Sequence, residues 1–365
     1  MRVVWLTARN PWSPSAGGAE RTVREVGSRL ARRGHDVVIL TEASRGGSSP
    51  QASGSLAVSL YNHQVWSHAV GSAQFVRRIE PDVVIDDLAH IVPWSRFPQK
   101  SPARVAFFRH LHSRTLAGQT SLPAALPLLL AERLYPLFYP RSTFVTESSS
   151  SERDLQSLGI RKSRIRQIAP GVDAESYRPA VKTPYPSLVY FAGLKGYKRP
   201  TEIIPVFRQL RRKLPNATLT VVGDGPLRDS LMRLAKEHDV AGQVRFTGRV
   251  ADNELAIIVS ESWVNLHFSV SEGWGYSTLE AAACGTPTVG YHAPGVDDAV
   301  DTGNSGILVR SGDRDAVVNS VVLITQRPAR WSRTARQWAL RFDWERCASE
   351  WEDTLRHAKH SPGDA

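Results

Sequence analysis

Short runs of apolar, β-branched residues alternate with amphipathic helical segments along most of the chain. Residues 2–7 (RVVWLT) and 36–41 (DVVILT) are two such apolar runs. Between them, Val23, Val26 and Leu30 recur at helical spacing. A strand, a helix and a second strand this close together form a βαβ unit, which requires a parallel sheet whose strands are buried on both faces.

The same alternation continues on both sides of the proline-rich residues 179–186, which are the best candidate for a linker. Upstream, further strands are expected at 82–86, 104–108 and 143–146. Downstream, strands are expected at 187–193, 217–223, 243–248, 263–269 and 287–291, with helices at 200–215, 226–239, 252–262 and 277–285. The pattern therefore predicts two doubly wound α/β domains, a number that suits a chain of 365 residues. Ligands bind such sheets at the carboxyl ends of the strands.

Composition excludes several classes of protein. Cys284 and Cys347 are too few for a disulfide framework or a zinc cluster, which favours a reduced, cytoplasmic compartment. The N-terminal apolar run is too short for a signal peptide, and no run of eighteen apolar residues indicates a membrane span. The net charge of +11 would suit anionic partners or substrates, although solvated arginines on helix surfaces are the favoured explanation.

The stretch 269-SVSEGWGYSTLE-280 follows an expected strand and places two carboxylates among small residues. Its glycines remove side chains from the loop, so backbone N–H groups approach an anion or a sugar hydroxyl closely. Ser277 opens the next helix, whose N-terminus attracts negative charge. Glu272 over the loop and Glu280 in the helix then suit a sugar, a diphosphate and a ribose laid end to end. The alternative is a capping box between Ser277 and Glu280.

This E-x(7)-E pattern, with the small residues 281-AAACGTPTVGYHAPG-295 after it, resembles the C-terminal domain of the group 1 (family 4-like) glycosyltransferases, which are retaining, nucleotide-sugar-dependent enzymes of the GT-B fold. The resemblance covers nearly the whole chain, and its pieces are specific in their order and spacing rather than singly. They are 15-SAGGAER-21 for the glycine loop, 223-GDGP-226 for the G-x-G-P turn, 245-RFTGRV-250 for the nucleobase loop and 342-FDWERCASEWEDTL-355 for the C-terminal helix.

The resemblance assigns roles to individual positions. Glu272 would contact the hydroxyls of the donor sugar, and Glu280 would accept hydrogen bonds from the ribose. Gly17 and Gly18 would let the N-terminal domain close over the donor phosphate and the acceptor. The other implied donor-binding residues are Arg249 and Val250 at the base, Gly273, Trp274 and Gly275 at the sugar and phosphate, and Tyr276, Ser277 and Thr278 at the diphosphate.

The sequence departs from the family in its diphosphate clamp. In 191-FAGLKGYKRP-200, Lys198 matches the family's lysine, whereas the position of the family's arginine holds Gly193. A missing cation would weaken stabilisation of the leaving group, which is electrostatic and often the largest catalytic contribution. Lys195 or Arg199 could replace it, and of the two we expect Arg199 to point to solvent.

A second departure concerns the histidine that the family places after a strand of its N-terminal domain, near the reacting sugar. The expected strand at 104–108 runs into 109-RHLHS-113, so the matching position is Arg109, with His110 one step later and His112 three. We assign the family's catalytic role to His110. The alternative is that its ring is satisfied by local hydrogen bonds.

The resemblance implies a GT-B fold, in which two Rossmann-like doubly wound domains face a central cleft. The expected domains are an acceptor-binding domain at 1–183, a donor domain at 184–340 and a helix at 341–365 that crosses back to the first domain. The implied reaction is retaining transfer of a sugar from a UDP- or GDP-sugar to a hydroxyl acceptor, in polysaccharide, glycolipid or other glycoconjugate biosynthesis. The glutamates then position the donor instead of forming a glycosidase pair.

No metal or other cofactor is implied beyond the nucleotide-sugar co-substrate. Asp313 and Asp315 have the spacing of a metal motif, but they stand at an expected helix start, where Asp is a cap. A lipid-linked acceptor would place the protein at the inner face of the membrane, in contact with anionic lipid. The apolar segment 122–140 is a candidate docking element, with a buried helix pair as the favoured alternative.

Two other classes of function stay open. A nucleotide-sugar epimerase or a phosphorylase would use the same fold, and a non-catalytic polyanion-binding protein would use the charge. No recognition helix or zinc spacing supports a nucleic-acid partner, and none is expected.

Overall fold

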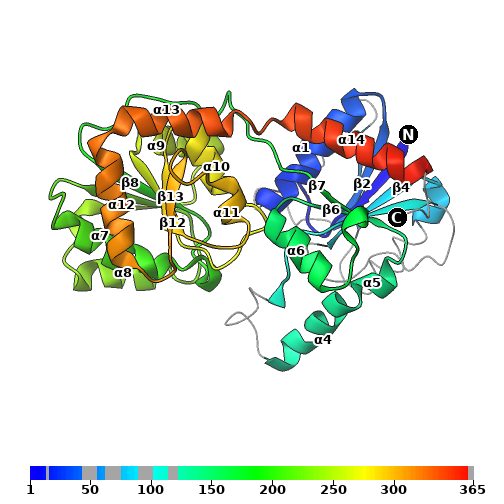
Figure 1. Ribbon diagram of the computed structural model, residues 1–365, viewed down its shortest axis with the longest axis horizontal. Coiled ribbons are helices and arrows are strands. Elements are labelled where there is room, and N and C mark those ends of the chain that lie inside the picture. Colours follow the sequence, from blue (N-terminus) through cyan, green and yellow to red (C-terminus); the bar gives the residue numbers. More distant parts are fainter. Residues whose placement is uncertain (14–15, 43–55, 62–74, 89–101, 114–121, 361–365) are drawn as a thin grey trace. The chain divides into compact units, whose positions relative to one another are not determined.

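The computed structural model describes residues 1–13, 16–42, 56–61, 75–88, 102–113 and 122–360. These residues form two compact units (Figure 1). The first unit contains the described residues of 1–171 and 344–365, and the second contains Val172–Asp343. The chain thus leaves the first unit after Gly171 and returns at Trp344, where the sequence had suggested divisions at 183–184 and 340–341.

A parallel sheet forms the centre of the first unit, with the strand order β3-β2-β1-β4-β5-β6-β7 in the described residues. The strands are β1 (Arg2–Leu6), β2 (Asp36–Glu42), β3 (Leu56–Tyr61), β4 (Val83–Asp87), β5 (Ala103–Phe107), β6 (Thr143–Thr146) and β7 (Ile165–Gln167). Its helices are α1 (Gly18–Arg32), α4 (Leu122–Arg133), α5 (Tyr135–Phe138), α6 (Ser149–Ser157) and α14 (Trp344–His360), with the 3₁₀ turn η2 (Lys162–Arg164). The order reverses at β1, which pairs with both β2 and β4.

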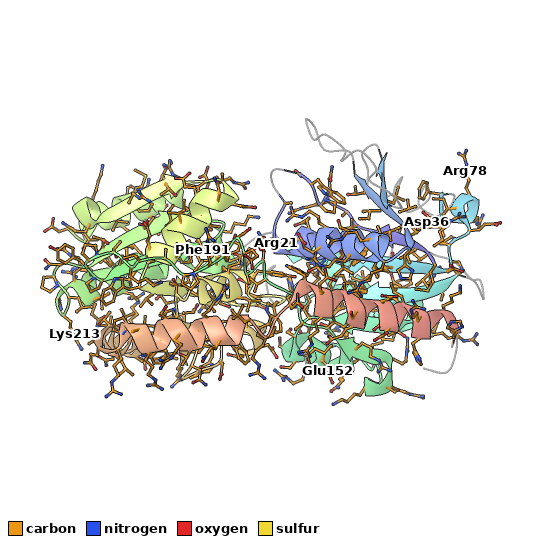
Figure 2. The ribbon with its side chains drawn as sticks, turned by 90° about the horizontal axis from the view of Figure 1, so that it is seen from above. Arg21, Asp36, Arg78, Glu152, Phe191 and Lys213 are labelled. Carbon is orange, nitrogen blue, oxygen red and sulfur yellow. The ribbon has the colours of Figure 1, made fainter. Side chains whose placement is uncertain are left out.

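The C-terminal helix α14 belongs to this first unit and lies beside α1 (Figure 2). Trp351 on α14 packs its ring 5.0 Å from that of Trp5 on β1 and 4.9 Å from that of Phe107 on β5. At the other side of the helix, His35 Nε2 lies 3.0 Å from Glu352 Oε1. Aromatic packing and charged contacts therefore both fix α14 to the first unit.

A second parallel sheet, of order β10-β9-β8-β11-β12-β13, forms the centre of the second unit. Its strands are β8 (Ser187–Phe191), β9 (Thr218–Val222), β10 (Val244–Gly248), β11 (Val264–His267), β12 (Thr288–Tyr291) and β13 (Gly306–Val309). Around it lie α7 (Ile203–Arg211), α8 (Arg228–Glu237), α9 (Asp252–Glu261), α10 (Tyr276–Ala283), α11 (Val296–Ala299), α12 (Arg314–Gln326) and α13 (Pro328–Ala339), with the 3₁₀ turns η3 (Gly196–Lys198), η4 (Pro200–Glu202) and η5 (Ala241–Gln243).

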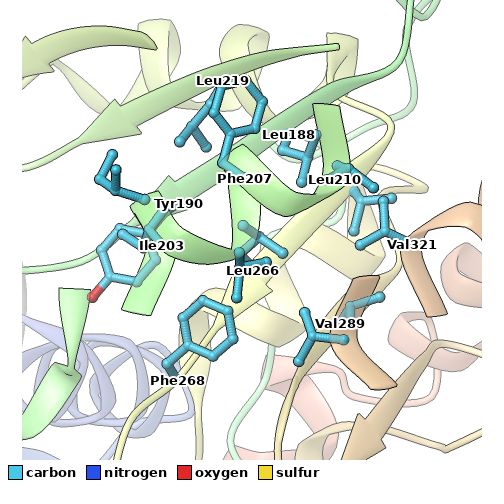
Figure 3. Close-up of a cluster of buried hydrophobic side chains, with 14 of the residues drawn as sticks. Leu188, Tyr190, Ile203, Phe207, Leu210, Leu219, Leu266, Phe268, Val289 and Val321 are labelled. Carbon is cyan, nitrogen blue, oxygen red and sulfur yellow. The ribbon is translucent and has the colours of Figure 1, made fainter. Parts of the chain in front are cut away.

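One face of this sheet is covered by α7 and α12, which bury a continuous apolar cluster (Figure 3). Leu188, Leu219 and Leu266 come from three neighbouring strands and meet Phe207 of α7 and Val321 of α12. Burying each such side chain contributes about 1.5–3 kcal/mol. This packing supports the strands whose carboxyl ends carry the site described below.

The predicted α/β architecture with two doubly wound sheets is confirmed. The last two helices of the described chain, α13 and α14, lie in different units. Trp331 packs in the second unit, and Trp344 and Trp351 pack in the first.

The segment 122–140 forms α4 and α5, but the buried helix pair expected there is wrong in part. Leu126, Leu130 and Leu137 are 55%, 52% and 74% exposed. Tyr135 and Tyr139 of the segment enter the core, and Phe138 packs partly against it. Among the described residues, no helix is both long and apolar enough to span a bilayer.

Candidate active site

The carboxyl edge of the second sheet brings together the loops that follow four of its strands. Three backbone hydrogen bonds join these loops: from Leu194 N–H to the Asp224 carbonyl (3.0 Å), from Gly223 N–H to the Gly248 carbonyl (2.8 Å) and from Val270 N–H to the Tyr197 carbonyl (2.8 Å). At Gly223, with φ +127°, a Cβ would lie 2.1 Å from the Ala192 carbonyl oxygen, so only glycine fits this close approach. The edge is a single surface at the place where α/β sheets bind ligands.

Lys198 and Glu272 form an ion pair on this edge. Lys198 ends η3, Glu272 lies in the loop after β11, and their side chains are 16% and 14% exposed. Burial would raise the pKa of the Glu272 carboxyl, but Lys198, with help from His267, holds that pKa below its usual value. Burial would lower the pKa of Lys198, and Glu272 more than offsets this, so the pKa is raised. Both groups are therefore charged at neutral pH.

Three buried polar atoms on the same side of the sheet have no hydrogen-bond partner in the described part of the chain. They are His267 Nε2, Ser271 Oγ and Trp274 Nε1, on residues that are 1–3% exposed. His267 Nε2 lies 3.6 Å from Glu272 Oε1, beyond hydrogen-bond distance. Because most buried polar groups are hydrogen-bonded, and an unsatisfied one costs about 1–3 kcal/mol, this group of atoms is typical of a site that a ligand completes.

The helix α10 begins directly after the two glycines of the motif. Gly275 is its N-cap, with φ +99°, a conformation that favours glycine. The Thr278 hydroxyl donates to the Gly275 carbonyl at 2.7 Å, and Ser277 Oγ lies 3.4 Å from His267 Nδ1. Glu280 is buried within the helix, which has no side-chain hydrogen bond at its cap, so the alternative of a capping box with Ser277 is wrong.

The space beside Gly193 is open. In the described structure, a Cβ on Gly193 would have the Cε of Lys195 as its one neighbour within 4 Å, at 4.0 Å. Arg199, expected to point to solvent, donates from Nη1 to Ser311 Oγ at 2.7 Å on the surface. Of the two cations that could replace the family's arginine, Lys195 is therefore the one beside Gly193.

The remaining predicted donor positions of the second unit also lie in these loops. Arg249 and Val250 follow β10, with Arg249 exposed and Val250 packed partly against the core. Gly273 and Tyr276 are half-buried on either side of Trp274 and Gly275. The structure thus brings the predicted residues together at one edge, while their individual roles stay predictions.

In the first unit, the glycine loop opens α1. Gly18 is the first residue of the helix, and Gly17 N–H donates to Glu20 Oε2 at 2.7 Å. The carboxylate of Glu20 therefore engages the N–H that precedes the helix. The predicted contact of Gly17 and Gly18 with the donor phosphate stays a prediction.

Arg109 is held in a buried cluster of charges at the carboxyl edge of the first sheet. Its Nη2 lies 3.1 Å from Asp87 Oδ2, and its Nη1 lies 3.4 Å from Glu147 Oε1. The hydroxyls of Thr7 and Thr22 donate to Asp87 (3.2 Å) and Glu147 (2.8 Å), respectively. Because these residues come from the ends of the four strands β1, β4, β5 and β6 and from α1, Arg109 joins those elements as a structural cation.

His110, the predicted catalytic histidine, directly follows Arg109 and is half-buried. Its ring centroid lies 5.1 Å from that of His112. His112 is oriented by Glu132 of α4, since Glu132 Oε1 lies 3.0 Å from His112 Nδ1. Arg109 therefore stabilises the fold through its pairs with Asp87 and Glu147. The assignment of the family's histidine role to His110 stays a prediction.

His267, Asp87 and Glu147 were not predicted from the sequence. Each one ends or directly follows a buried strand, and a polar residue at that place is a signal that would have found all three. The expected cap is confirmed: Asp313 Oδ1 accepts from Ala316 N–H at 2.9 Å at the start of α12. In the described residues, no group of three His, Cys, Asp or Glu side chains could hold a metal ion.

Comparison with known proteins agrees with this arrangement. The family model "Glycosyl transferases group 1" matches residues 173–338, and the model "Glycosyltransferase Family 4" matches residues 16–176. The two models together therefore account for most of both units.

The chain belongs to the group 1 glycosyltransferases.

Several known proteins are similar to this glycosyltransferase over most of its length. The glycogen synthase of Mycobacterium tuberculosis is 28% identical over 375 residues, covering 91% of this chain and 89% of that protein. The sucrose-phosphate synthase of Thermosynechococcus elongatus superposes with a TM-score of 0.82 at 18% identity, covering 98% of both chains. Anabaena Alr3699/HepE, solved in complex with UDP-glucose, gives 0.74 at 18% identity over 98% of this chain and 99% of that one. The fold is GT-B, as predicted.

Proposed function

We propose that this glycosyltransferase moves a sugar from a UDP- or GDP-sugar to a hydroxyl acceptor with retention of configuration at the sugar carbon. The observation that carries the proposal is the buried Lys198–Glu272 pair beside the start of α10, at the carboxyl edge of the second sheet. A nucleotide-sugar donor is in keeping with the UDP-glucose bound in Alr3699/HepE.

The donor diphosphate would lie between Lys198 and the N-terminus of α10. The first N–H groups of a helix have no intrahelical acceptor and attract anions. The Thr278 hydroxyl is engaged by the Gly275 carbonyl, so backbone N–H groups are better placed than this hydroxyl to donate to phosphate oxygens. Lys195, beside Gly193, would supply the second positive charge. Such charges act most strongly on the developing charge of the leaving group.

Glu272 would accept hydrogen bonds from the donor sugar, and Glu280 from the ribose. In the reaction, the bond from the anomeric carbon to the diphosphate oxygen breaks, and the acceptor oxygen forms a bond on the same face. The proton of the acceptor hydroxyl passes to the leaving phosphate, so neither glutamate has to act as a base. With Lys198 and α10 neutralising the diphosphate, the proposal requires no metal ion.

The test is product analysis with an isotope-labelled donor. We expect the label to appear on the acceptor, and NMR to show that the transferred sugar keeps the anomeric configuration of the donor. We expect EDTA to leave turnover unaffected. A nucleotide-linked epimer formed without acceptor would indicate an epimerase, and a sugar phosphate formed from inorganic phosphate would indicate a phosphorylase. An inverted product would contradict the retaining mechanism.

We further propose that the enzyme meets a lipid-linked acceptor at an anionic membrane surface through α4 and α5. Leu126, Leu130 and Leu137 are exposed at helical spacing, and Arg133 lies exposed at the end of α4. Co-sedimentation with vesicles of anionic phospholipid should be reduced by salt and lost in Leu126→Ser/Leu130→Ser. Equal binding of wild type and variant, or no salt-sensitive binding, would refute this docking.

A further inference from the structure

His267 lies between the two halves of the candidate donor site. It is the last residue of β11 and is 3% exposed. Its Nδ1 lies 3.4 Å from Ser277 Oγ at the start of α10, and its Nε2 lies 3.6 Å from Glu272 Oε1 in the preceding loop. The backbone of His267 pairs with Gly290 of β12. The two strands approach so closely that a Cβ on Gly290 would lie 2.0 Å from the His267 carbonyl oxygen.

The chemistry of the neighbours selects one form of this imidazole. Burial, which outweighs the attraction of Glu272, and the charge of Lys198 together lower the pKa of His267 to about 4. The ring is therefore neutral at physiological pH, with one N–H donor and one nitrogen acceptor. A carboxylate only accepts, so the Nε2–H tautomer faces Glu272. The Ser277 hydroxyl then donates to Nδ1.

We propose that neutral His267 is a positioning residue of the donor site, which links the Glu272 carboxylate to Ser277 and so keeps the sugar-binding group in register with the start of α10. The inference rests on the proposed function, because it assigns the two linked groups to the sugar and the diphosphate. Glu272 Oε1 then accepts from Lys198 and has the ring of His267 beside it, with Nε2 at 3.6 Å.

This arrangement also decides what Ser277 offers a ligand. Its hydroxyl proton is engaged by Nδ1, so Ser277 Oγ faces a bound diphosphate without a hydrogen to donate. A phosphate oxygen near it would therefore depend on backbone N–H groups of α10. Loss of the imidazole would free the hydroxyl to rotate and would release Glu272 on one side.

The tautomer and the charge of His267 are measurable without any substrate. In protein labelled with ¹⁵N-histidine, the resonances that disappear in His267→Phe belong to this ring. We expect the Nε2–H tautomer, unchanged from pH 5 to pH 8. An Nδ1–H tautomer, or a titration near the ordinary pKa of about 6.5, would overturn the proposal even if no donor for the enzyme had been found.

Kinetics then separate positioning from packing. His267→Phe keeps the volume of the ring and removes both nitrogens, while His267→Gln keeps an N–H donor near the place of Nε2. We expect kcat/KM for the nucleotide sugar to fall about tenfold or more in the Phe variant, with partial recovery in the Gln variant. We expect the thermal midpoint to change little, because the unsatisfied Nε2 is also removed. Equal kcat/KM in wild type and His267→Phe, or equal losses in the two variants, would overturn the proposal.

Discussion

Lys198 and Glu272 support both the fold and the proposed chemistry, and variants of single residues separate these two tasks. Each charge is buried, and each is stabilised by the other. Removing one partner leaves an uncompensated charge away from water, whereas removing both leaves none. The stability of the fold and the binding of donor therefore respond differently to single and double substitutions.

Lys198→Met should destabilise the protein by about 3 kcal/mol, because it leaves the Glu272 carboxylate without a compensating positive charge. Lys198→Met/Glu272→Gln should recover most of that stability without recovering activity. Because the folded-state pKa of Glu272 is lowered, the pair stabilises the protein above the unfolded pKa of 4.5, and this contribution is lost as the pH falls through the folded value. Denaturant unfolding of the wild type and the two variants at pH 7 measures the differences in stability. A double variant less stable than Lys198→Met would contradict the expected recovery.

Substitutions of Lys195 and Arg199 test which of these two cations replaces the arginine that the family has at the position of Gly193. Lys195 lies beside Gly193, whereas Arg199 donates to Ser311. Lys195→Ala should raise the Kd for a nucleoside diphosphate several-fold, and Arg199→Ala should leave it within twofold. Isothermal titration calorimetry with both variants tests the assignment, and the opposite ranking would place the second cation at Arg199.

The sequence located Glu272, Glu280 and Lys198 because their spacing in a recognisable motif fixes their place in the fold. It did not locate His267, since a histidine at a strand end has no pattern of its own. It also left Arg109 and His110 as alternatives. Only the fold shows that Asp87 and Glu147, distant in sequence, enclose the arginine.

At the scale of elements, the carboxyl edges of the two sheets depend on helices and strands that the sequence predicted unequally. The long buried strands and amphipathic helices were predicted, because periodicity carries over many residues. The strands β3, β7 and β13 were not predicted; short length explains only β7, which has three residues, because the four-residue strands β6, β11 and β12 were predicted. A separate C-terminal helix was expected from the family resemblance with a division at 340–341, and the chain changes units between Asp343 and Trp344.

The attachment of α14 to the first unit should depend on pH through Glu352. Arg356, and beyond it His35 and Arg33, lower the pKa of Glu352 to about 2, although burial opposes this. A lowered pKa contributes stability above the unfolded value of 4.5, and this contribution disappears as the pH falls from 4.5 to about 2. Glu352→Gln should therefore unfold at lower denaturant than wild type at pH 7, with the gap narrowing in that window.

Glu350→Gln is the control for this prediction. Glu350 lies on the same helix but forms an exposed pair with Arg346, so its loss should cost less than about 0.5 kcal/mol. Hydrogen exchange of α14 at pH 7 should be faster in Glu352→Gln alone. Equal protection of α14 in the two variants would show that aromatic packing, rather than this charged contact, holds the helix.

At the scale of the whole molecule, the chain combines two parallel sheets, each with a polar cluster at its carboxyl edge. The cluster of the first unit is a buried network around Arg109, and that of the second holds the Lys198–Glu272 ion pair. The sequence predicted this architecture because the βαβ alternation repeats along the chain. It did not fix the nucleotide base, because base contacts depend on a few loop side chains.

We propose that the second unit binds a nucleotide sugar at Lys198 and Glu272. A thermal-shift screen measures this binding as a rise in the midpoint of thermal unfolding. The panel is UDP, GDP, ADP and TDP with their sugars, each added to wild type and to Lys198→Met/Glu272→Gln. A ligand that binds only the folded state stabilises it by about 2.7 kcal/mol at a hundredfold excess over Kd. We expect the nucleotides of one base to raise the thermal unfolding midpoint of wild type by several degrees. The midpoint of the double variant should stay nearly unchanged. No shift with any nucleotide, or equal shifts in both proteins, would contradict it.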